Sequence, residues 1–396
     1  MKQQPALLLP LIIISQFAGT SLWFVGNAIL PDLQRQLNLD SHAISQITAA
    51  VQIGFIAGTL FFAVLSIADR FSAPTVFFVC TCFAAAANIL LVWLASEVYM
   101  VYLLRFATGF FLAGIYPVGM KIAAEWYEKG LGKALGYLVG ALVLGTSFPH
   151  LLKGGYLQLP WQKVLLFTSA FAVVGGLLVT FFVGDGPYRK QGSGFHPRSL
   201  IHVFRSWAFK SAAFGYFGHM WELYTFWSFL PVLLQMYAKE HNISLGISML
   251  SFVIIAAGSI SCVLGGYWSQ RKGSAKVAWY ALLCSGICCL LAPFMLKVSM
   301  PVFMIFLLIW SLAVIADSPQ FSALVAMSAP ADNKGTALTF VTSVGFFITV
   351  VSMFVFDQIL HYTDFSAYTF LLLAIGPLLG LISLRVILQM NGTPHR

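Results

Sequence analysis

Charged side chains are scarce in this chain: they make up 9% of its 396 residues, whereas a soluble globular protein carries roughly 25%. Hydrophobic residues make up 59% of the sequence. So few charges cannot cover a water-facing surface, which excludes a soluble globular protein. We therefore predict an all-α membrane protein that crosses the bilayer many times.

Enzyme motifs are also lacking. The sequence contains no run of metal ligands, no nucleotide-binding loop, no nucleophile motif and no soluble domain of useful size. Its six cysteines lie within apolar runs without paired C-x-x-C spacing. We expect no enzyme activity, no cofactor and no metal. A membrane-embedded enzyme or sensor is the alternative, and turnover of a substrate that is not moved would support it.

Apolar runs long enough to span a bilayer, about 20 residues each, are present instead. The first run exceeds a signal-peptide core and lacks a cleavage site, so we expect it to be retained. The polar, basic segment 186–210 predicts a cytoplasmic linker between an N-terminal domain, 1–185, and a C-terminal domain, 211–396. The twelve predicted spans are 5–30, 43–67, 74–95, 99–123, 131–152, 164–184, 211–236, 243–269, 276–296, 301–327, 335–356 and 366–389.

The net charge of +9 first suggests an acidic partner such as nucleic acid. The basic residues are too sparse for such a patch, and most of the 22 Lys and Arg fall in segments on the same side as the N-terminus. This bias follows the positive-inside rule. It predicts cytoplasmic N- and C-termini in a bacterial inner membrane, and it excludes a nucleic-acid partner.

The two halves repeat each other at an offset of roughly 200 residues. Asp69-Arg70 aligns with Gln270-Arg271, "GKALGYLVG" at 132–140 aligns with "GTALTFVTS" at 335–343, and Pro117 aligns with Pro319. A duplicated six-span unit with a site between the halves is a transporter architecture.

At this point the whole chain resembles the major facilitator superfamily. The loop after span 2 keeps Asp69 and Arg70 of the family pattern G-x-x-x-D-R-x-G-R-R, and span 4 matches R-x-x-x-G with Arg105 and Gly109. The resemblance implies two pseudo-symmetric six-helix bundles and a gating role for Asp69, Arg70 and Arg271. The drug-antiporter Gly-Pro pair is absent from span 5, which counts against that export subclass.

Two acids lie deep in the predicted spans. At about 1.5 Å per residue, Glu222 is roughly 16 Å into span 7, and Asp317 lies in span 10 before Pro319, where we expect a kink. Burial disfavours the charged form of a carboxyl group. His219 shares a helix face with Glu222. We interpret Glu222, Asp317 and His219 as proton-coupling residues; the alternative for each is a structural hydrogen bond.

Polar residues elsewhere in the spans predict contacts with solute. Arg105 either snorkels outward or faces inward to a substrate. The predicted substrate-binding residues are Gln16, Thr20, Trp23 and Asn27, on one face of span 1, with Gln52, Arg105 and Gln320.

We therefore expect a secondary active transporter of a small solute that works by alternating access with proton coupling. Uptake of an organic anion or chelate is favoured, and multidrug or metabolite efflux by proton antiport is the alternative. Its partners would be the solute, protons and the lipid bilayer, with the protein acting as a monomer.

Overall fold

The computed structural model describes residues 7–127, 131–155, 157–189, 202–330 and 334–390. The chain divides into two compact units: unit 1 comprises Met1–Gly194 and Ser248–Ala256, and unit 2 comprises Phe195–Ile247 and Ala257–Arg396. Both termini and residues 190–201 of the predicted linker, 186–210, lie outside the described residues. Among the described residues the regular elements are all helical, as predicted.

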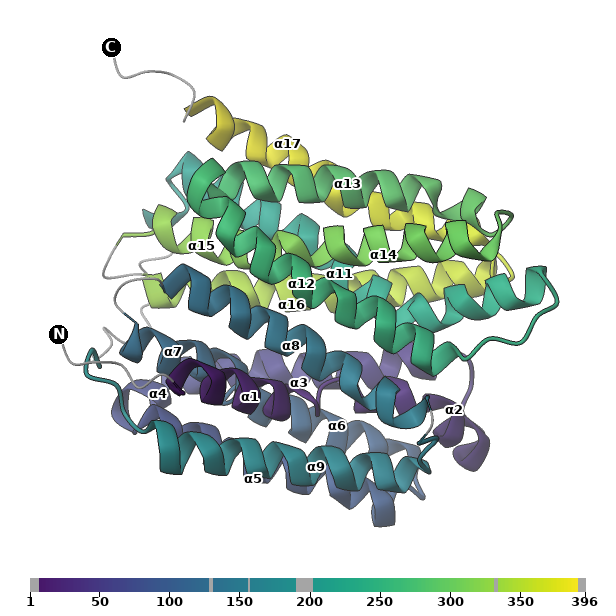
Figure 1. Ribbon diagram of the computed structural model, residues 1–396, viewed down its shortest axis with the longest axis horizontal. Helices are drawn as coiled ribbons and strands as arrows, with labels where there is room; N and C mark the ends of the chain where they lie inside the picture. The colour runs from purple at the N-terminus through teal and green to yellow at the C-terminus, as the bar shows by residue number, and fades with distance from the viewer. Residues whose placement is uncertain (1–6, 128–130, 156, 190–201, 331–333, 391–396) are drawn as a thin grey trace. The chain divides into compact units, whose positions relative to one another are not determined.

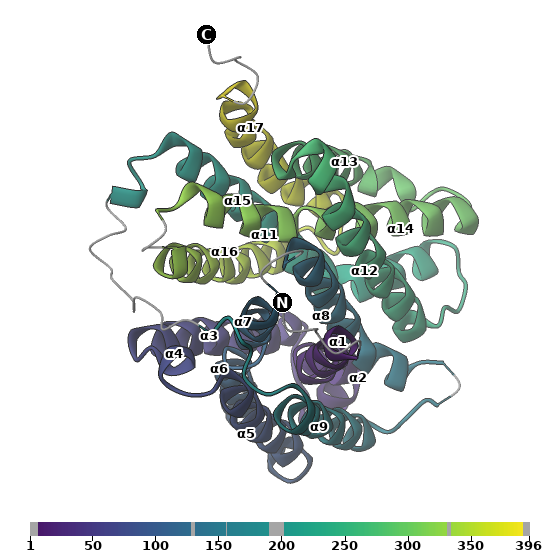
Figure 2. The ribbon, with the colours of Figure 1, turned by 60° about the vertical axis from the view of Figure 1, so that its left-hand side comes forward.

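Unit 1 is built from helices that run roughly along one direction in Figure 1. Helix α3 packs on α6, α5 packs on α6 and α9, and α1 packs on α8 and α9. Figure 2 shows the same helices closer to end-on. The elements are α1 (Leu8–Thr20), α2 (Val25–Leu37), α3 (Ala43–Val64), α4 (Ile67–Arg70), α5 (Ala73–Leu94), α6 (Val98–Leu112), α7 (Tyr116–Trp126), α8 (Leu131–Lys153), α9 (Trp161–Leu178) and the π-helix η1 (Val179–Val183).

Unit 2 is centred on α11, which packs on α16 and α17, and on α13, which packs on α14 and α17. The chain enters it after the linker and ends in α17 (Figure 1). Its elements are α11 (Trp207–Glu240), α12 (Ile247–Lys272), α13 (Ser274–Met295), α14 (Met300–Ala316), α15 (Ser318–Ser328), α16 (Lys334–Tyr362), the 3-10 helix η3 (Ala367–Ala374) and α17 (Ile375–Met390). Residues Ser248–Ala256 of α12 are counted with unit 1.

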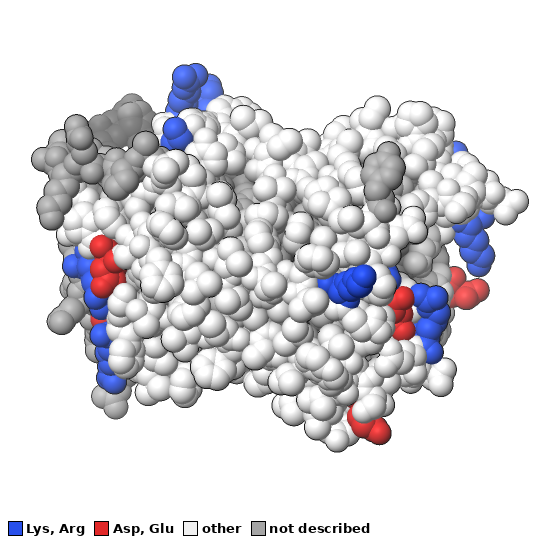
Figure 3. Space-filling view, turned by 60° about the horizontal axis from the view of Figure 1, so that its bottom comes forward, with Lys and Arg blue, Asp and Glu red and all other residues white. Residues whose placement is uncertain are grey.

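Eleven spans in the described residues are long and apolar enough to cross a membrane. The remaining predicted span, 211–236, corresponds to α11. Its 34 residues are long enough to cross a membrane, but they include the polar residues His219 and Glu222. Large apolar side chains such as Phe181 and Leu264 are more than 60% exposed. On the face shown in Figure 3, charged side chains lie toward the two ends and leave an uncharged band between them. That surface suits contact with lipid.

Three spans are interrupted, and the sequence predicted a kink only in span 10. Span 1 extends to Leu37, beyond the predicted end at residue 30, and breaks at residues 21–24. Spans 4 and 10 break before α7 and α15, whose first turns contain Pro117 and Pro319. Proline lacks the N–H that would continue the helix ladder. The two duplicated prolines therefore interrupt equivalent helices in the two units.

Candidate functional site

Glu222 lies on α11 and is buried inside unit 2, with 1% of its surface exposed. Its carboxyl group accepts hydrogen bonds from Trp310 Nε1 at 2.7 Å, Ser285 Oγ at 2.9 Å and Cys289 Sγ at 3.2 Å. Phe226, one turn further along α11, stacks on Trp310 with ring centroids 4.3 Å apart. These three donors offset the cost of placing a carboxyl group among apolar helices. The group faces α13 and α14 of its own unit, not lipid.

His219 lies one turn before Glu222 but contacts a different acid. Its Nδ1 is 2.8 Å from Oδ1 of Asp317, and both side chains are 1% exposed. Neither ring nitrogen has any other hydrogen-bond partner among the described residues. The Phe321 ring lies 6.0 Å from the imidazole, centroid to centroid. The helix-face spacing suggested a His219–Glu222 pair, whereas the structure pairs His219 with Asp317.

Asp317 occupies the interruption between α14 and α15. It ends α14 and precedes Ser318 and Pro319 in the first turn of α15. The backbone N–H of Phe321 donates to the Asp317 carbonyl at 2.9 Å, which starts the new helix. The kink predicted from Pro319 is confirmed, and it places an ionisable side chain where the helix ladder is broken.

Arg105 is fully buried in unit 1, and neutral groups hold its guanidinium. Nη1 donates to Oδ1 of Asn88 at 3.0 Å. Nη2 donates to the carbonyl oxygens of Leu22 at 2.9 Å and Trp23 at 2.6 Å. Among the described residues, Nε has no hydrogen-bond partner and no carboxylate lies within 4.0 Å of the guanidinium. Snorkelling is therefore wrong for Arg105, and unit 1 contains a buried cation without a paired acid.

Close packing of α6 on α3 fixes the position of Arg105. Gly109 of α6 faces the carbonyl of Val51, and Gly54 of α3 faces the carbonyl of Phe106, so closely that a Cβ at either glycine would overlap the opposite backbone. Small residues allow this approach between membrane helices. The R-x-x-x-G pattern thus places the Arg105 side chain one turn from a contact between backbones.

The polar stripe predicted for span 1 does not follow one continuous helix. Gln16 and Thr20 lie on α1 and Asn27 on α2, whereas Trp23 lies in the break between them. The Thr20 hydroxyl donates to the Gln16 carbonyl at 2.7 Å, a bond that competes with the helix ladder. All four side chains are buried. The broken turn supplies the carbonyl oxygens that accept from Arg105.

The predicted amides differ in how far their hydrogen bonds are satisfied. Asn27 Nδ2 donates to Thr48 Oγ1 at 2.8 Å. Gln52 is fully buried on α3, and neither end of its amide has a hydrogen-bond partner among the described residues. The same holds for Oε1 of Gln16. Gln320 is buried on α15 in unit 2. Buried polar groups are normally bonded, so Gln16 and Gln52 have capacity left for water or solute.

Comparison with known proteins decides the family. The Major Facilitator Superfamily model matches residues 11–353, most of the chain. The chain belongs to this superfamily. Its members are transporters, which makes this a membrane transport protein and supports the expectation of no enzyme activity. A search of curated proteins found no match.

Solved structures share the superfamily fold. The crystal structure of the human organic anion transporter MFSD10 (TETRAN) matches with a TM-score of 0.76 and 16% sequence identity, covering 96% of this chain and 100% of that chain. At this identity the likeness shows the fold alone. The predicted fold of twelve helices in two pseudo-symmetric bundles is confirmed.

The superfamily loop after α3 forms an ion-pair cluster at one end of unit 1. Asp69 pairs with Lys121 of α7, whose ammonium also lies 4.0 Å from Glu125. Arg70 and Arg271 are exposed and have no ion pair within the described part of the chain. Of the three predicted gating residues, Asp69 is thus the one with an ion pair among the described residues.

Residues that follow η1 also hold the loop after α4. Ser72 Oγ donates to Asp185 at 2.8 Å, and Arg189 donates to Asp185 at 3.0 Å and to the Phe71 carbonyl at 2.8 Å. The sequence analysis did not anticipate the contacts of Ser72 with Asp185 and of Arg189 with Phe71, because each joins residues more than 100 positions apart. It also missed the donors to Glu222, for which the only signal was the four-residue spacing of Ser285 and Cys289.

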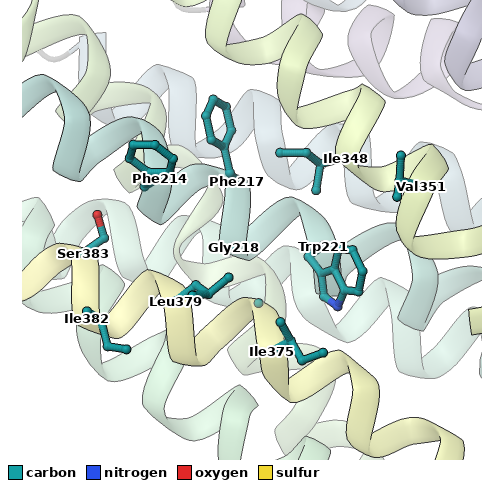
Figure 4. A pocket seen from close by; sticks show the side chains of 11 residues that line it. Phe214, Phe217, Gly218, Trp221, Ile348, Val351, Ile375, Leu379, Ile382 and Ser383 are labelled. Carbon is teal, nitrogen blue, oxygen red and sulfur yellow. The ribbon is translucent and has the colours of Figure 1, made fainter. Parts of the chain in front are cut away.

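An apolar groove of about 600 Å³ lies between α11, α16 and α17 of unit 2. Figure 4 shows Phe214, Phe217 and Trp221 of α11 beside Ile375 and Leu379 of α17. The indole of Trp221 already donates to a backbone carbonyl at 2.9 Å. Because its lining is almost entirely apolar, this groove does not suit a charged solute. It lies on a different face of α11 from His219 and Glu222.

Proposed function

We propose that this protein is a proton-coupled secondary transporter that takes up an organic anion by alternating access. The His219–Asp317 contact supports coupling. It is a buried ionisable pair at a helix interruption, and intramembrane ionisable residues mark ion or substrate pathways. Glu222 is a second buried acid of the same unit, so protons have two acceptors within unit 2.

Arg105 supports the choice of an anion. Its permanent charge is surrounded by an amide and two carbonyl oxygens, which are weaker partners than a carboxylate. A solute carboxylate would complete the charge pairing that the described residues leave open. Gln16 and Gln52 add buried amide groups to the same unit. The printed name of the similar human structure, an organic anion transporter, agrees with this choice.

The test uses the purified protein in liposomes that enclose a pH-sensitive dye. Radiolabelled mono- and dicarboxylates are added outside under an imposed pH gradient. We expect one class to accumulate together with protons, and Asp317→Asn and Glu222→Gln to weaken the coupling. Unchanged proton movement per solute in both variants would remove these residues from the mechanism.

The apolar groove favours a second candidate, efflux of lipophilic compounds by proton antiport. Phe214 and Leu379 on its rim are more than half exposed, so a compound dissolved in the bilayer would reach it directly. Retention of a lipophilic dye by cells that lack the protein, reversed by expression of the wild type but not of Phe217→Ser, would favour this candidate.

The bias of basic residues supports cytoplasmic termini and the cytoplasmic location of the Asp69–Lys121 cluster, which we propose to act as a gate. A bacterial inner membrane and a monomeric state complete the proposal.

A further inference from the structure

Unit 2 has a cationic pocket at the turn between α12 and α13. The pocket has a volume of about 320 Å³ and is lined by residues 272–276 together with Leu324, Met327 and Leu388. Two lysines, Lys272 and Lys276, therefore share it with three aliphatic side chains.

Gly273 brings these lysines to the same pocket. It ends α12 and caps α13 with φ of +83°, a conformation that glycine adopts without strain. The turn is so short that Lys272, the last residue of α12, and Lys276, in the first turn of α13, line one cavity. A longer loop would separate the two charges.

No acidic side chain in the described part of the chain pairs with these lysines. The sequence contains no Asp or Glu between Glu240 and Asp317. In the equivalent loop of unit 1, Asp69 pairs with Lys121. The second copy has Gln270 at the position of Asp69, so its cations remain available to an external anion.

The surroundings of the pocket are those of a membrane interface. Met327 is 65% exposed. On the neighbouring surface of α12 and α13, the rings of Trp268 and Tyr280 are 51% and 54% exposed and lie parallel, 6.4 Å apart. Exposed Trp and Tyr mark the level of lipid headgroups. The basic bias predicts that this end faces the cytoplasm, where the leaflet carries anionic lipids.

We propose that this pocket binds the headgroup of an anionic phospholipid. The phosphate contacts Lys272 and Lys276, and the start of an acyl chain lies along Met327 and Leu388. A free phosphate ion would use the lysines but gain nothing from the aliphatic wall. This site is independent of the solute and proton sites proposed above.

The experiment measures lipid binding to the full chain in neutral detergent by native mass spectrometry, with dioctanoyl phosphatidylglycerol and dioctanoyl phosphatidylcholine as probes. We expect phosphatidylglycerol to bind more tightly than phosphatidylcholine. The double variant Lys272→Gln/Lys276→Gln should weaken the affinity for phosphatidylglycerol roughly 25-fold, since each cation near an anionic lipid contributes about five-fold in affinity. The matched control is Lys239→Gln/Lys297→Gln, which removes two exposed lysines away from the pocket, one near the C-terminal end of α11 and one two residues after α13. It should leave binding unchanged.

Three results would overturn the proposal: equal binding of the two lipids, equal losses in the two double variants, or full displacement of the lipid by an equimolar amount of inorganic phosphate. The last result would identify a site for free anions. Met327→Ser tests the aliphatic wall separately. It should weaken phosphatidylglycerol binding several-fold but leave phosphate binding unaltered, and an unaltered lipid affinity would count against the acyl-chain contact.

Discussion

Nδ1 of His219 and Oδ1 of Asp317 lie 2.8 Å apart at a point where both side chains are almost wholly withdrawn from the surface. The histidine comes from the unbroken helix α11, and the acid comes from the break between α14 and α15. The pair therefore joins the continuous helix α11 to the interruption between α14 and α15. A change in its protonation would alter a contact at the break.

Replacing either His219 or Asp317 alone should lower the free energy of unfolding more than replacing both. His219→Gln leaves Asp317 buried without a counter-charge, and breaking a buried pair costs about 3–5 kcal/mol. In His219→Gln/Asp317→Asn both charges are gone. The double variant should therefore lose less free energy of unfolding than the sum of the losses in His219→Gln and Asp317→Asn, a non-additivity that thermal unfolding of all three variants in detergent measures. Strictly additive losses would show that the two groups do not interact.

Glu222 can be tested with two replacements that differ in hydrogen bonding. Glu222→Gln keeps a carbonyl acceptor for Trp310 and Cys289, which share Oε1, and its amide N–H can donate to the Ser285 hydroxyl in place of Oε2. It cannot ionise, so stability should change little while the pH dependence of solute transport changes. Glu222→Leu leaves the buried donors unpaired, at about 1–3 kcal/mol each. Thermal unfolding and pH profiles of flux separate the two effects. Equal destabilisation by Gln and Leu would contradict the hydrogen-bonding role.

Arg105 should discriminate among solutes by charge. Arg105→Lys retains one positive charge but loses the planar donor geometry that serves Asn88 and the Leu22 and Trp23 carbonyls together. We expect at least a ten-fold loss in uptake of carboxylates. Binding of the same solutes, measured by calorimetry, should weaken in parallel. Full retention of anion binding in Arg105→Lys and Arg105→Gln would exclude the guanidinium as the anion site.

Contact between α11 and α17 depends on the absence of side chains at Gly218 and Gly376. A Cβ at Gly218 would overlap the Gly376 carbonyl, whereas a Cβ at Gly335 would meet no atom within 4 Å. Gly218→Ala should therefore lower the unfolding temperature. Gly335→Ala should leave it unchanged or raise it slightly, because alanine is the better helix former. The opposite order would show that α11 and α17 can separate freely.

The Asp69–Lys121 pair predicts rescue by charge reversal. Asp69→Lys and Lys121→Asp each place like charges together, so each should reduce transport, and the double exchange should recover a substantial part of it. Arg70→Gln, at an exposed residue without an ion pair among the described residues, is the matched control and should have a smaller effect. Failure of the exchange to rescue either variant would leave the pair without a gating role.

The sequence predicted the features of the fold that depend on local composition, namely the spans and the break in span 10. Apolar runs located the spans to within a few residues at most ends, and Pro319 located the break at Asp317, because proline acts on its own helix. The break at residues 21–24 has no such marker. It depends on hydroxyls that bond back to the helix and on Arg105, which accommodates the released carbonyl oxygens from another helix.

The candidate site was harder to predict because its contacts join distant segments. Helical spacing placed His219 beside Glu222, but the choice of Asp317 as its partner depends on how α11 packs against α15. The three donors to Glu222 come from α13 and α14, 63 to 88 residues further along the chain. Periodicity identifies which face of a helix is polar, but it does not identify the helix that faces it.

The interruptions before Pro117 and Pro319 leave α7 and α15 with 11 residues each. At 1.5 Å per residue such a segment is roughly 16 Å long, about half the thickness of the hydrocarbon core. Each of these two spans thus consists of two shorter helices in series, α6 and α7 in unit 1 and α14 and α15 in unit 2. Because the helix ladder is interrupted between them, one helix of each pair can tilt without carrying the other with it.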